Sequence, residues 1–337
     1  MKRLILALAA LAGLAGVASA DVLGLSSGSE ISAPRLAAGD LDGDGVDELV
    51  AGGRVGPFLP ATAPAAQRRA AVEVSAIAYL SNGMQLPRVV ARSTGLTVVE
   101  DVAVGDVDGD GVPEILAVGN GELSVFACRG PRLEVVDQYP TPAGRAWRVA
   151  AADVDGDGRD EVAVAVIGAT LAEGDVPSAA VTLYRVDGAL IDVATLRLDG
   201  HIGDLCLGDF SGDGLPQLAL ELGREEIGGL VQVYGVRGGL YDEQLSQRLT
   251  GTDQRVLGLA AVPQGSRDLL ALAPVRGAVR LARQTGDRMA VIAKQPMPAA
   301  AAPVRSLVSL NAGDPALSPR LLSVGGHMLW HLTGLTR

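Results

Sequence analysis

The residues whose types and spacing are suited to chemistry are carboxylates in a nine-residue pattern that recurs along the chain. The pattern is DLDGDGVDE at 40–48, DVDGDGVPE at 106–114 and DVDGDGRDE at 153–161, with a weaker copy, DFSGDGLPQ, at 209–217. The three full copies have acidic residues at positions 1, 3, 5 and 9 and a glycine at position 6. Ca²⁺ prefers about six to eight oxygen ligands at roughly 2.3–2.6 Å, and the glycine permits a tight turn that adds a carbonyl at position 7. The pattern therefore predicts a hard-cation site in each full copy.

An EF-hand loop begins with the same D-x-D-x-D-G string and is the first alternative. An EF-hand needs a bidentate Glu at position 12 and a helix on each side, but position 12 is Ala51, Ala117 and Val164 in the three full copies. The flanking segments are short apolar runs such as 36–38 and 49–51, which favour strands over helices. We therefore expect each loop to join two antiparallel strands.

These loops and their flanking strands resemble the FG-GAP/VCBS-type repeats of β-propellers, as in the integrin α-subunit head and many secreted bacterial proteins. The resemblance extends over nearly the whole chain after residue 20 and is specific for the three full loops. It implies that the metal loops are structural and that ligand recognition uses the opposite face of the propeller.

The resemblance also implies a ligand set, made of the side chains at positions 1, 3, 5 and 9 and the carbonyl of position 7. The sets are Asp40, Asp42, Asp44, Val46 and Glu48; Asp106, Asp108, Asp110, Val112 and Glu114; and Asp153, Asp155, Asp157, Arg159 and Glu161. In the weaker copy the same positions are Asp209, Ser211, Asp213, Leu215 and Gln217. Because only two of those last residues are charged, we expect three Ca²⁺ sites and a fourth that is weak or empty.

An alignment on the loops shows a repeat of about fifty residues. Each unit begins with a strand of small apolar residues, at 36–38, 102–104, 149–151, 205–207, 257–262 and 307–310. The third strand carries an aromatic residue in five of six units, Tyr79, Phe126, Tyr184, Tyr234 and Trp330, with Ala282 in the sixth. A Gly-containing turn and a fourth strand follow. We therefore predict an all-β fold, a β-propeller of six four-stranded blades, with seven blades, as in the integrin heads, as the alternative.

The last unit ends after its third strand, so its blade lacks one strand. The segment Asp21–Ile31 precedes the first inner strand and is free to supply it. Such a closure joins the two ends of the ring and removes its open edges. We expect the N-terminal segment to be the outermost strand of the last blade.

The first twenty residues differ in composition from the rest. Lys2 and Arg3 precede an apolar core at 4–17, and the small residues Ala18-Ser19-Ala20 precede Asp21. This arrangement predicts a secretory signal peptide at 1–20, a single propeller domain at 21–337, and a periplasmic or extracellular location. The alternative, an uncleaved anchor, has a core shorter than the ~20 residues that a membrane span needs. No other segment is long enough, so we expect no membrane span in the mature chain.

The formal charge of −11 arises mainly from the loops. The four loops hold 16 of the 39 acidic residues, and the other 23 are outnumbered by 28 Lys and Arg. Clustered acids repel a phosphate backbone, and no basic stripe compensates, so we expect no nucleic-acid binding. The two cysteines, Cys128 and Cys206, fall on strands two blades apart, which predicts buried free thiols rather than a disulfide.

The longest insertions, 52–72, 167–178 and 222–229, fall on the face opposite the loops, where we expect an unknown protein or glycan partner. Catalytic patterns are few. Gly24-Leu25-Ser26-Ser27-Gly28 matches G-x-S-x-G outside a strand-turn-helix context. The three histidines, His201, His327 and His331, lack a third metal ligand nearby in sequence. Phe58 and Trp147 are the aromatic candidates for a sugar platform.

The sequence thus favours an exported Ca²⁺-binding propeller that is a non-catalytic binding or scaffold module. Two alternatives stay open. One is a carbohydrate-binding lectin, and the other is a polysaccharide lyase or esterase on the same scaffold with His201 as a general base.

Overall fold

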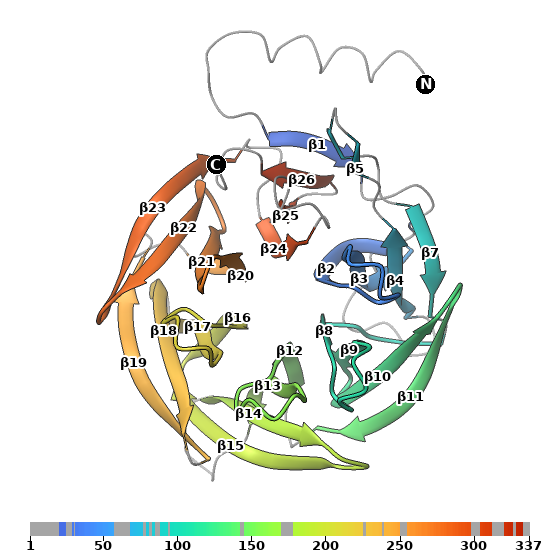
Figure 1. Cartoon of the computed structure of the whole chain (residues 1–337), viewed down its shortest axis with the longest axis horizontal. Helices are drawn as coiled ribbons and strands as arrows, with labels where there is room; N and C mark the ends of the chain where they lie inside the picture. Colours follow the sequence, from blue (N-terminus) through green and yellow to red (C-terminus); the bar gives the residue numbers. More distant parts are fainter. Residues whose placement is uncertain are drawn as a thin grey trace, which may run out of the picture.

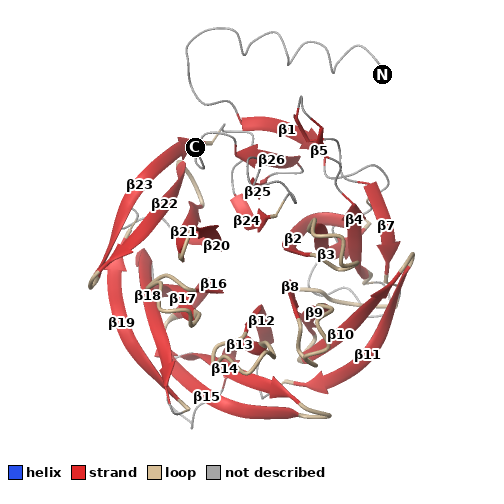
Figure 2. Ribbon diagram, in the orientation of Figure 1, coloured by secondary structure: helices blue, strands red, loops and turns tan. Residues whose placement is uncertain are grey.

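The computed structural model describes residues 20–24, 29, 31–56, 68–76, 79–80, 83–84, 88–93, 95–141, 145–169, 178–224, 227–237, 239–249, 255–297, 304–311, 320–325 and 328–332. Over these ranges the chain consists of strands and connecting loops (Figure 2). No described segment is a helix long and apolar enough to cross a membrane. The prediction of an all-β fold is confirmed.

In the described part of the chain, the strands form six four-stranded groups around a common axis (Figure 1). We call these groups blades one to six. Blade one comprises β2 (Ile31–Gly39), β3 (Glu48–Val55), β4 (Ala70–Ala76) and β7 (Arg88–Arg92). Blade two comprises β8 (Asp101–Gly105), β9 (Glu114–Gly119), β10 (Glu122–Arg129) and β11 (Arg132–Pro140). Blade three comprises β12 (Arg145–Ala152), β13 (Glu161–Ala169), β14 (Ser178–Val186) and β15 (Leu190–Asp199).

The second half of the ring repeats this order. Blade four comprises β16 (His201–Gly208), β17 (Gln217–Arg224), β18 (Ile227–Arg237) and β19 (Leu240–Arg248). Blade five comprises β20 (Val256–Gln264), β21 (Arg267–Pro274), β22 (Ala278–Thr285) and β23 (Arg288–Pro296). Blade six comprises β24 (Val304–Leu310), β25 (Arg320–Gly325), β26 (Met328–Leu332) and β1 (Ala20–Gly24). All neighbours within a blade are antiparallel, and the outer strands of blades one and two also meet in one parallel pair, Arg92 with Arg132.

The ring closes through its two ends. β1 pairs antiparallel with β26, in a register that runs from Ala20 opposite Leu332 to Gly24 opposite Met328. The N-terminal strand is therefore the outer strand of blade six, as the sequence predicted. Closure of this kind stabilises the fold because it pairs an edge that is otherwise exposed to other chains.

The apolar core lies between neighbouring blades. Six clusters of buried side chains each join two adjacent blades in the described residues. Second strands such as β9 are buried along their whole length because both sheet faces meet a neighbouring blade. Outer strands such as β23 alternate between buried and exposed residues because one face meets solvent.

Blade one departs from the predicted strand assignment. Its third strand is β4, and Tyr79 lies instead in β5 (Tyr79–Leu80), which pairs with β6 (Gly83–Met84) as a separate small hairpin. The prediction that Tyr79 marks this third strand is wrong. The register shows why: Ser75 pairs with Leu49, as Phe126 pairs with Ile115 in blade two, so Ser75 holds the aromatic position.

The predicted insertions are shorter than expected. β3 extends to Val55 and β4 begins at Ala70, while residues 57–67, which include Phe58, lie outside the described residues. β13 and β14 likewise extend into 167–178, and β17 and β18 extend into most of 222–229. The connections are therefore shorter than the predicted insertions, and most of 222–229 is strand.

Charged side chains occupy one register position on the inner strands, beside the axis. They are Arg35 on β2, Asp101 on β8, Arg148 on β12 and Asp204 on β16. Arg148 is 1% exposed, and its Nε lies 3.0 Å from Asp204 Oδ1, while Arg35 Nη1 lies 3.7 Å from the same oxygen. Arg35 attracts both Asp101 and Asp204, so each buried carboxylate has a cation in its surroundings.

Candidate metal centre

Four loops connect the first and second strands of blades one to four and lie on the same face of the ring (Figure 1). We call them loop one (40–48), loop two (106–114), loop three (153–161) and loop four (209–217). Each joins two antiparallel strands, and no helix flanks any of them. The strand-to-strand prediction is confirmed, and the EF-hand alternative does not fit this geometry.

The aspartate at position 1 holds each loop in shape. In loop one, Asp40 Oδ1 accepts hydrogen bonds from the amides of Gly43 (2.8 Å) and Asp44 (3.0 Å), and Asp40 Oδ2 accepts from Gly45 (2.8 Å). The three bonds recur in the other loops around Asp106, Asp153 and Asp209. A carboxylate that accepts several backbone amides fixes a turn through charge-assisted bonds.

The glycine at position 6 is required by the backbone. Gly45 has φ 85°, and Gly111, Gly158 and Gly214 have φ 86–88°. A side chain is strained in this left-handed region, whereas glycine adopts it freely. The residue at position 2 anchors the loop, since Leu41, Val107, Val154 and Phe210 are all buried.

Carboxylates converge in the first three loops. Side-chain oxygens of positions 1, 3 and 9 lie within 4.8 Å of one another in three groups: Asp40, Asp42 and Glu48; Asp106, Asp108 and Glu114; and Asp153, Asp155 and Glu161. At position 5, Asp44 Oδ1 accepts a bond from the Val46 amide at 2.8 Å, as Asp110 does from Val112. Oxygen donors at this separation suit a hard cation such as Ca²⁺.

The closing glutamate is the least exposed of these carboxylates. Glu48 Oε2 accepts a bond from the Leu41 amide at 3.0 Å, and Glu114 Oε2 accepts from Val107 at 3.1 Å. Burial raises the pKa of Glu48 to about 7, and repulsion by the aspartates of the loop adds to the rise. The pKa of Glu114 is raised to about 7 for the same reasons. A cation bound among these carboxylates would supply a positive charge that opposes both rises.

In loop three, an arginine from a neighbouring strand contacts the carboxylates. Arg185 on β14 places Nη2 2.5 Å from Asp155 Oδ2, 3.2 Å from Asp157 Oδ2 and 3.0 Å from Glu161 Oε1. Burial raises the pKa of Glu161, but the bond from Arg185 opposes that rise. Sequence analysis did not single out Arg185, because it lies 24 residues after Glu161 and outside the loop.

Loop four has a neutral closing residue with a different hydrogen-bond pattern. Gln217 Oε1 accepts from the Phe210 amide (2.8 Å), as the glutamates accept from position 2 in the other loops, and it also accepts from the Ser211 amide (3.1 Å). Gln217 Nε2 donates to Ser211 Oγ (3.0 Å), Asp213 Oδ1 (3.3 Å) and the Leu215 carbonyl (2.6 Å). These acceptors are the predicted ligand atoms of positions 3, 5 and 7.

Aspartates at position 8 connect the loops to neighbouring blades. The Asp160 amide donates to the Asp106 carbonyl (2.8 Å), and the Asp106 amide donates to Asp160 Oδ2 (2.9 Å). Asp268 and Asp209 form the same reciprocal pair between blades five and four. Asp47 forms it with Asn311 of blade six. Asp47 and Asp160 are loop residues in sequence, but their side chains bond to the adjacent blade.

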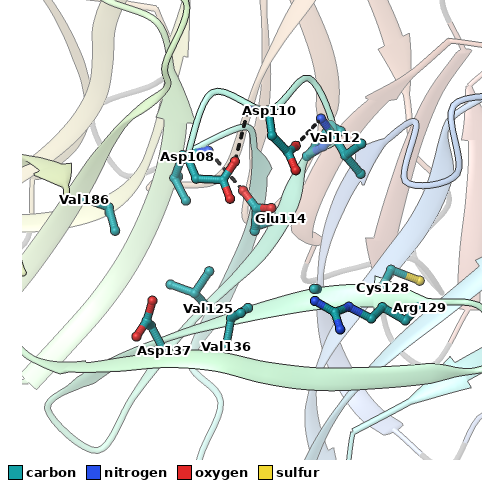
Figure 3. A pocket seen from close by; sticks show the side chains of 13 residues that line it. Asp108, Asp110, Val112, Glu114, Val125, Cys128, Arg129, Val136, Asp137 and Val186 are labelled. Atoms are coloured by element: carbon teal, nitrogen blue, oxygen red, sulfur yellow. Dashed lines mark hydrogen bonds between the residues drawn. The ribbon is translucent and has the colours of Figure 1, made fainter. Parts of the chain in front are cut away.

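A pocket of about 240 Å³ opens beside loop two (Figure 3). The carboxylates of Asp108, Asp110 and Glu114 lie along one side of it. Val125, Ala127 and Val136 of the outer strands line the other side, together with Asp137 and Arg129. Loop two is therefore accessible from solvent through a partly apolar hollow.

The other candidate residues have ordinary surroundings or lie outside the described part. His201 begins β16, its ring centroid is 6.4 Å from that of Trp147, and its pKa is lowered by burial and by Arg255. Trp147 is half-buried, with the guanidinium carbons of Arg148 and Arg145 at 4.1 and 4.9 Å from its ring. His327 and residues 25–28 are outside the described residues, as is the side chain of His331.

Both cysteines are free thiols, as predicted. Cys206 is buried on β16, and burial raises the pKa of its thiol. Cys128 on β10 is only half-buried, so the prediction of two buried thiols is wrong for this residue.

A sequence model of the FG-GAP-like repeat matches residues 106–164, which run from loop two into β13. Two solved structures of similar shape are crystal structures of BBS1N in complex with ARL6DN, one soaked with lead and the other with mercury. Their sequences are 13% and 14% identical to this chain, and both have a TM-score of 0.51. Each match covers 94% of this chain, and 99% and 98% of the two neighbours. The chain is a β-propeller with an FG-GAP-like repeat at residues 106–164. No curated protein matches it in sequence.

The FG-GAP match covers two of the three acidic loops and the strands between them. The shape similarity extends over nearly the entire chain, but at this identity it concerns the fold alone. The acidic clusters of loops one to three are therefore the feature that points to a function.

Proposed function

We propose that this protein is an exported, Ca²⁺-stabilised propeller that serves as a non-catalytic binding or scaffold module. The observation that carries the proposal is the convergence of three carboxylates within 4.8 Å in each of loops one to three. Such groups repel one another without a counter-ion, so a bound cation stabilises the folded state that holds them together.

The proposed role of the cation is to fix the loop face. The ligands in loop one are Asp40, Asp42, Asp44, the Val46 carbonyl and Glu48, and the equivalent residues serve loops two and three. When bound, Ca²⁺ supplies a positive charge that offsets the repulsion among these carboxylates. With a Kd of ~10⁻⁴ M and ~2 mM Ca²⁺, each filled loop contributes roughly 2 kcal/mol to stability.

The face opposite the loops is the proposed partner surface. The structural neighbour BBS1N is described in complex with another protein, ARL6DN, which favours a protein partner for a propeller of this kind. Rigid scaffolds usually bind through the connections that vary most in length. The connection between β3 and β4 has the longest span of residues between consecutive strands within a blade, from Val55 to Ala70.

Export follows from the N-terminal segment. Residues 1–20 have the basic, apolar and small-residue regions of a signal peptide. Export would bring the loops into a compartment where millimolar Ca²⁺ is available. N-terminal sequencing of the periplasmic and medium fractions tests this point, and Asp21 is the expected first residue.

Chelation is the direct test of the cation. Dialysis against EDTA is expected to lower the Tm by more than about 10 °C, because the three loops together lose about 6 kcal/mol and each kcal/mol shifts the Tm of a large domain by roughly 2–4 °C. A triple variant, Asp40→Asn, Asp106→Asn and Asp153→Asn, serves as the matched control and should melt at the same temperature with and without Ca²⁺. An unchanged Tm of the wild-type protein in EDTA contradicts the proposal.

The non-catalytic role has its own test. Wild-type protein and His201→Ala are assayed against polysaccharides and carboxylic esters. We expect no turnover from either protein. Activity that is present in the wild type and lost in the variant would support the lyase or esterase alternative instead.

A further inference from the structure

Loops three and four contain nitrogen atoms where the other loops leave room for a cation. We propose that Gln217 and Arg185 are internal substitutes for the metal: Gln217 keeps loop four free of metal permanently, and Arg185 competes with Ca²⁺ in loop three. The inference rests on the proposed Ca²⁺ function and assigns which loops perform it. Loops one and two then have the highest affinity, loop three is weaker, and loop four binds no ion.

The geometry of Gln217 fixes the orientation of its amide. Two backbone N–H groups, from Phe210 and Ser211, point at one atom of the side chain, which must be the acceptor Oε1. The Leu215 carbonyl contacts the other atom at 2.6 Å, which must be the donor Nε2. A flipped amide would place donor against donor and acceptor against acceptor.

This orientation points N–H protons at the predicted ligand atoms. In loops one and two the glutamate uses Oε2 to accept the position 2 amide, so Oε1 is available for a cation. In loop four, Nε2 replaces that free oxygen and donates to the oxygens of positions 3, 5 and 7. A cation at this place would meet N–H protons instead of lone pairs. The amide therefore donates hydrogen bonds to the predicted ligand atoms and at the same time excludes the metal.

Arg185 fills loop three from the neighbouring strand. Its guanidinium contacts Asp155, Asp157 and Glu161, which are positions 3, 5 and 9 of the predicted ligand set. The register shows that Arg185 directly follows Tyr184, which pairs with Val162. In blade two, Ala127 follows Phe126, which pairs with Ile115, and Ala127 lines the open pocket beside loop two. The Arg185 guanidinium beside loop three thus occupies the place that the pocket occupies beside loop two.

Two differences separate the substitutes. Gln217 is 2% exposed and held by five hydrogen bonds, so it stays in place. The Arg185 side chain is 34% exposed and reaches the loop from outside. A flexible, partly exposed ion pair is weak enough for a divalent cation to displace. We therefore assign exclusion to Gln217 and competition to Arg185.

Calcium titration of the purified protein by calorimetry, with bound ions counted by native mass spectrometry, tests the assignment. The wild type should bind two ions tightly and a third about tenfold more weakly, a factor typical of displacing a ~1.4 kcal/mol interaction. Arg185→Met should bring the third ion to the affinity of the first two. Ser211→Asp combined with Gln217→Glu restores the full acidic pattern and should add a fourth ion.

Arg283→Met is the matched control. Arg283 follows Ala282, which pairs with Leu270, so it occupies the place of Arg185 in blade five. Its guanidinium donates to Gln264 Oε1 at 2.6 Å, next to a turn without the acidic pattern. This variant should bind calcium as the wild type does.

The outcomes separate this inference from the proposed function. A wild-type protein that binds no calcium overturns both. Three equal sites in the wild type, with no change in Arg185→Met, overturn the role of Arg185 alone. Four ions in the wild type overturn the role of Gln217 alone. If either variant fails to fold, the stoichiometry and the affinity ratio of the wild type still decide, because two tight ions and one weak ion are expected there.

Discussion

Loop two and loop four have nearly the same backbone, and they differ in what lies at the centre. In both, the position 1 aspartate accepts three backbone amides at 2.7–3.1 Å. In both, an aspartate from the next blade, Asp160 or Asp268, forms reciprocal bonds with that residue. Loop two then presents converging carboxylates to an open pocket, whereas loop four presents the amide of Gln217.

The comparison separates the residues that shape the loop from those that converge at its centre. Position 1, the glycines and the inter-blade pair shape the loop, and all three features persist in loop four. Positions 3 and 9 decide whether the centre holds converging carboxylates or is closed by a hydrogen-bonded amide. A loop of this shape is therefore compatible with either solution, and the two can alternate around one ring.

The largest expected effect is at position 1. Asp106→Ala removes three charge-assisted hydrogen bonds and the cation of loop two, so we expect a loss of about 4 kcal/mol in Ca²⁺. Asp209→Ala removes only the hydrogen bonds and should cost about 2 kcal/mol, with or without the cation. Urea unfolding in Ca²⁺ and in EDTA measures both. If both variants lose the same free energy of unfolding in Ca²⁺, loop two binds no stabilising cation that loop four lacks.

A smaller loss is expected at position 5. Asp44→Ala should cost about 3 kcal/mol in Ca²⁺, because the cation and the bond from the Val46 amide are both lost. Asp213→Ala should cost about 1 kcal/mol, because Asp213 Oδ1 accepts only from Leu215 and Gln217. EDTA is expected to remove the excess cost of Asp44→Ala. A difference that persists in EDTA would show that the cation is not its cause.

Two buried aspartates on the inner strands of blades two and four allow a test of how stability depends on pH. Asp101 and Asp204 each accept a backbone bond from the next blade, but Asp204 also pairs with Arg148 at 3.0 Å. Burial raises the pKa of Asp101 above its ordinary 3.8, and nearby Asp204 adds to the rise. Between pH 4 and the raised pKa the folded state holds a proton that the unfolded state releases, so stability falls as pH increases.

Asp101→Asn removes this contribution. The variant should lose less stability than the wild type between pH 4 and pH 8, by about 1 kcal/mol, since one pKa unit corresponds to about 1.4 kcal/mol. Chemical denaturation in EDTA across this range excludes the contribution of bound Ca²⁺. Parallel curves for the two proteins would mean that the carboxyl is not perturbed by burial.

The smallest effect is expected from the inter-blade pairs. Asp160→Ala and Asp268→Ala each remove one acceptor for a backbone amide of the preceding loop, so each should cost about 1 kcal/mol. Because the pairs are alike in loops two and four, the two losses should agree within about 0.5 kcal/mol in EDTA. A much larger loss for one of them would show that the loops are not held in the same way.

The strand order could be predicted because the loops repeat in register. Once 40–48, 106–114, 153–161 and 209–217 are aligned, the apolar runs before and after each loop fall into equivalent strands. The same alignment predicted the closing N-terminal strand, which pairs with β26. It failed at Tyr79, because an aromatic residue was used as the marker and blade one has Ser75 at that position.

Local sequence determined the loops themselves. A carboxylate at position 1 and glycines at left-handed positions act within nine residues, so the turn is specified without the rest of the chain. The acidic residues at positions 3 and 9 likewise predict the convergence that the structure shows. These interactions are short in sequence, and sequence spacing alone fixes them.

Only the tertiary structure decided what meets these loops. Arg185 reaches loop three from 24 residues away, Asp160 bonds to Asp106 across a blade boundary, and Arg35 and Arg148 approach Asp204 beside the axis. Arg185 is brought near by the pairing of β13 with β14 within blade three, and the other partners are brought near by the packing of blades around the axis. The physical reason is that a charge or hydrogen-bond partner is selected by distance in space, which the repeat pattern leaves open until all blades are packed together.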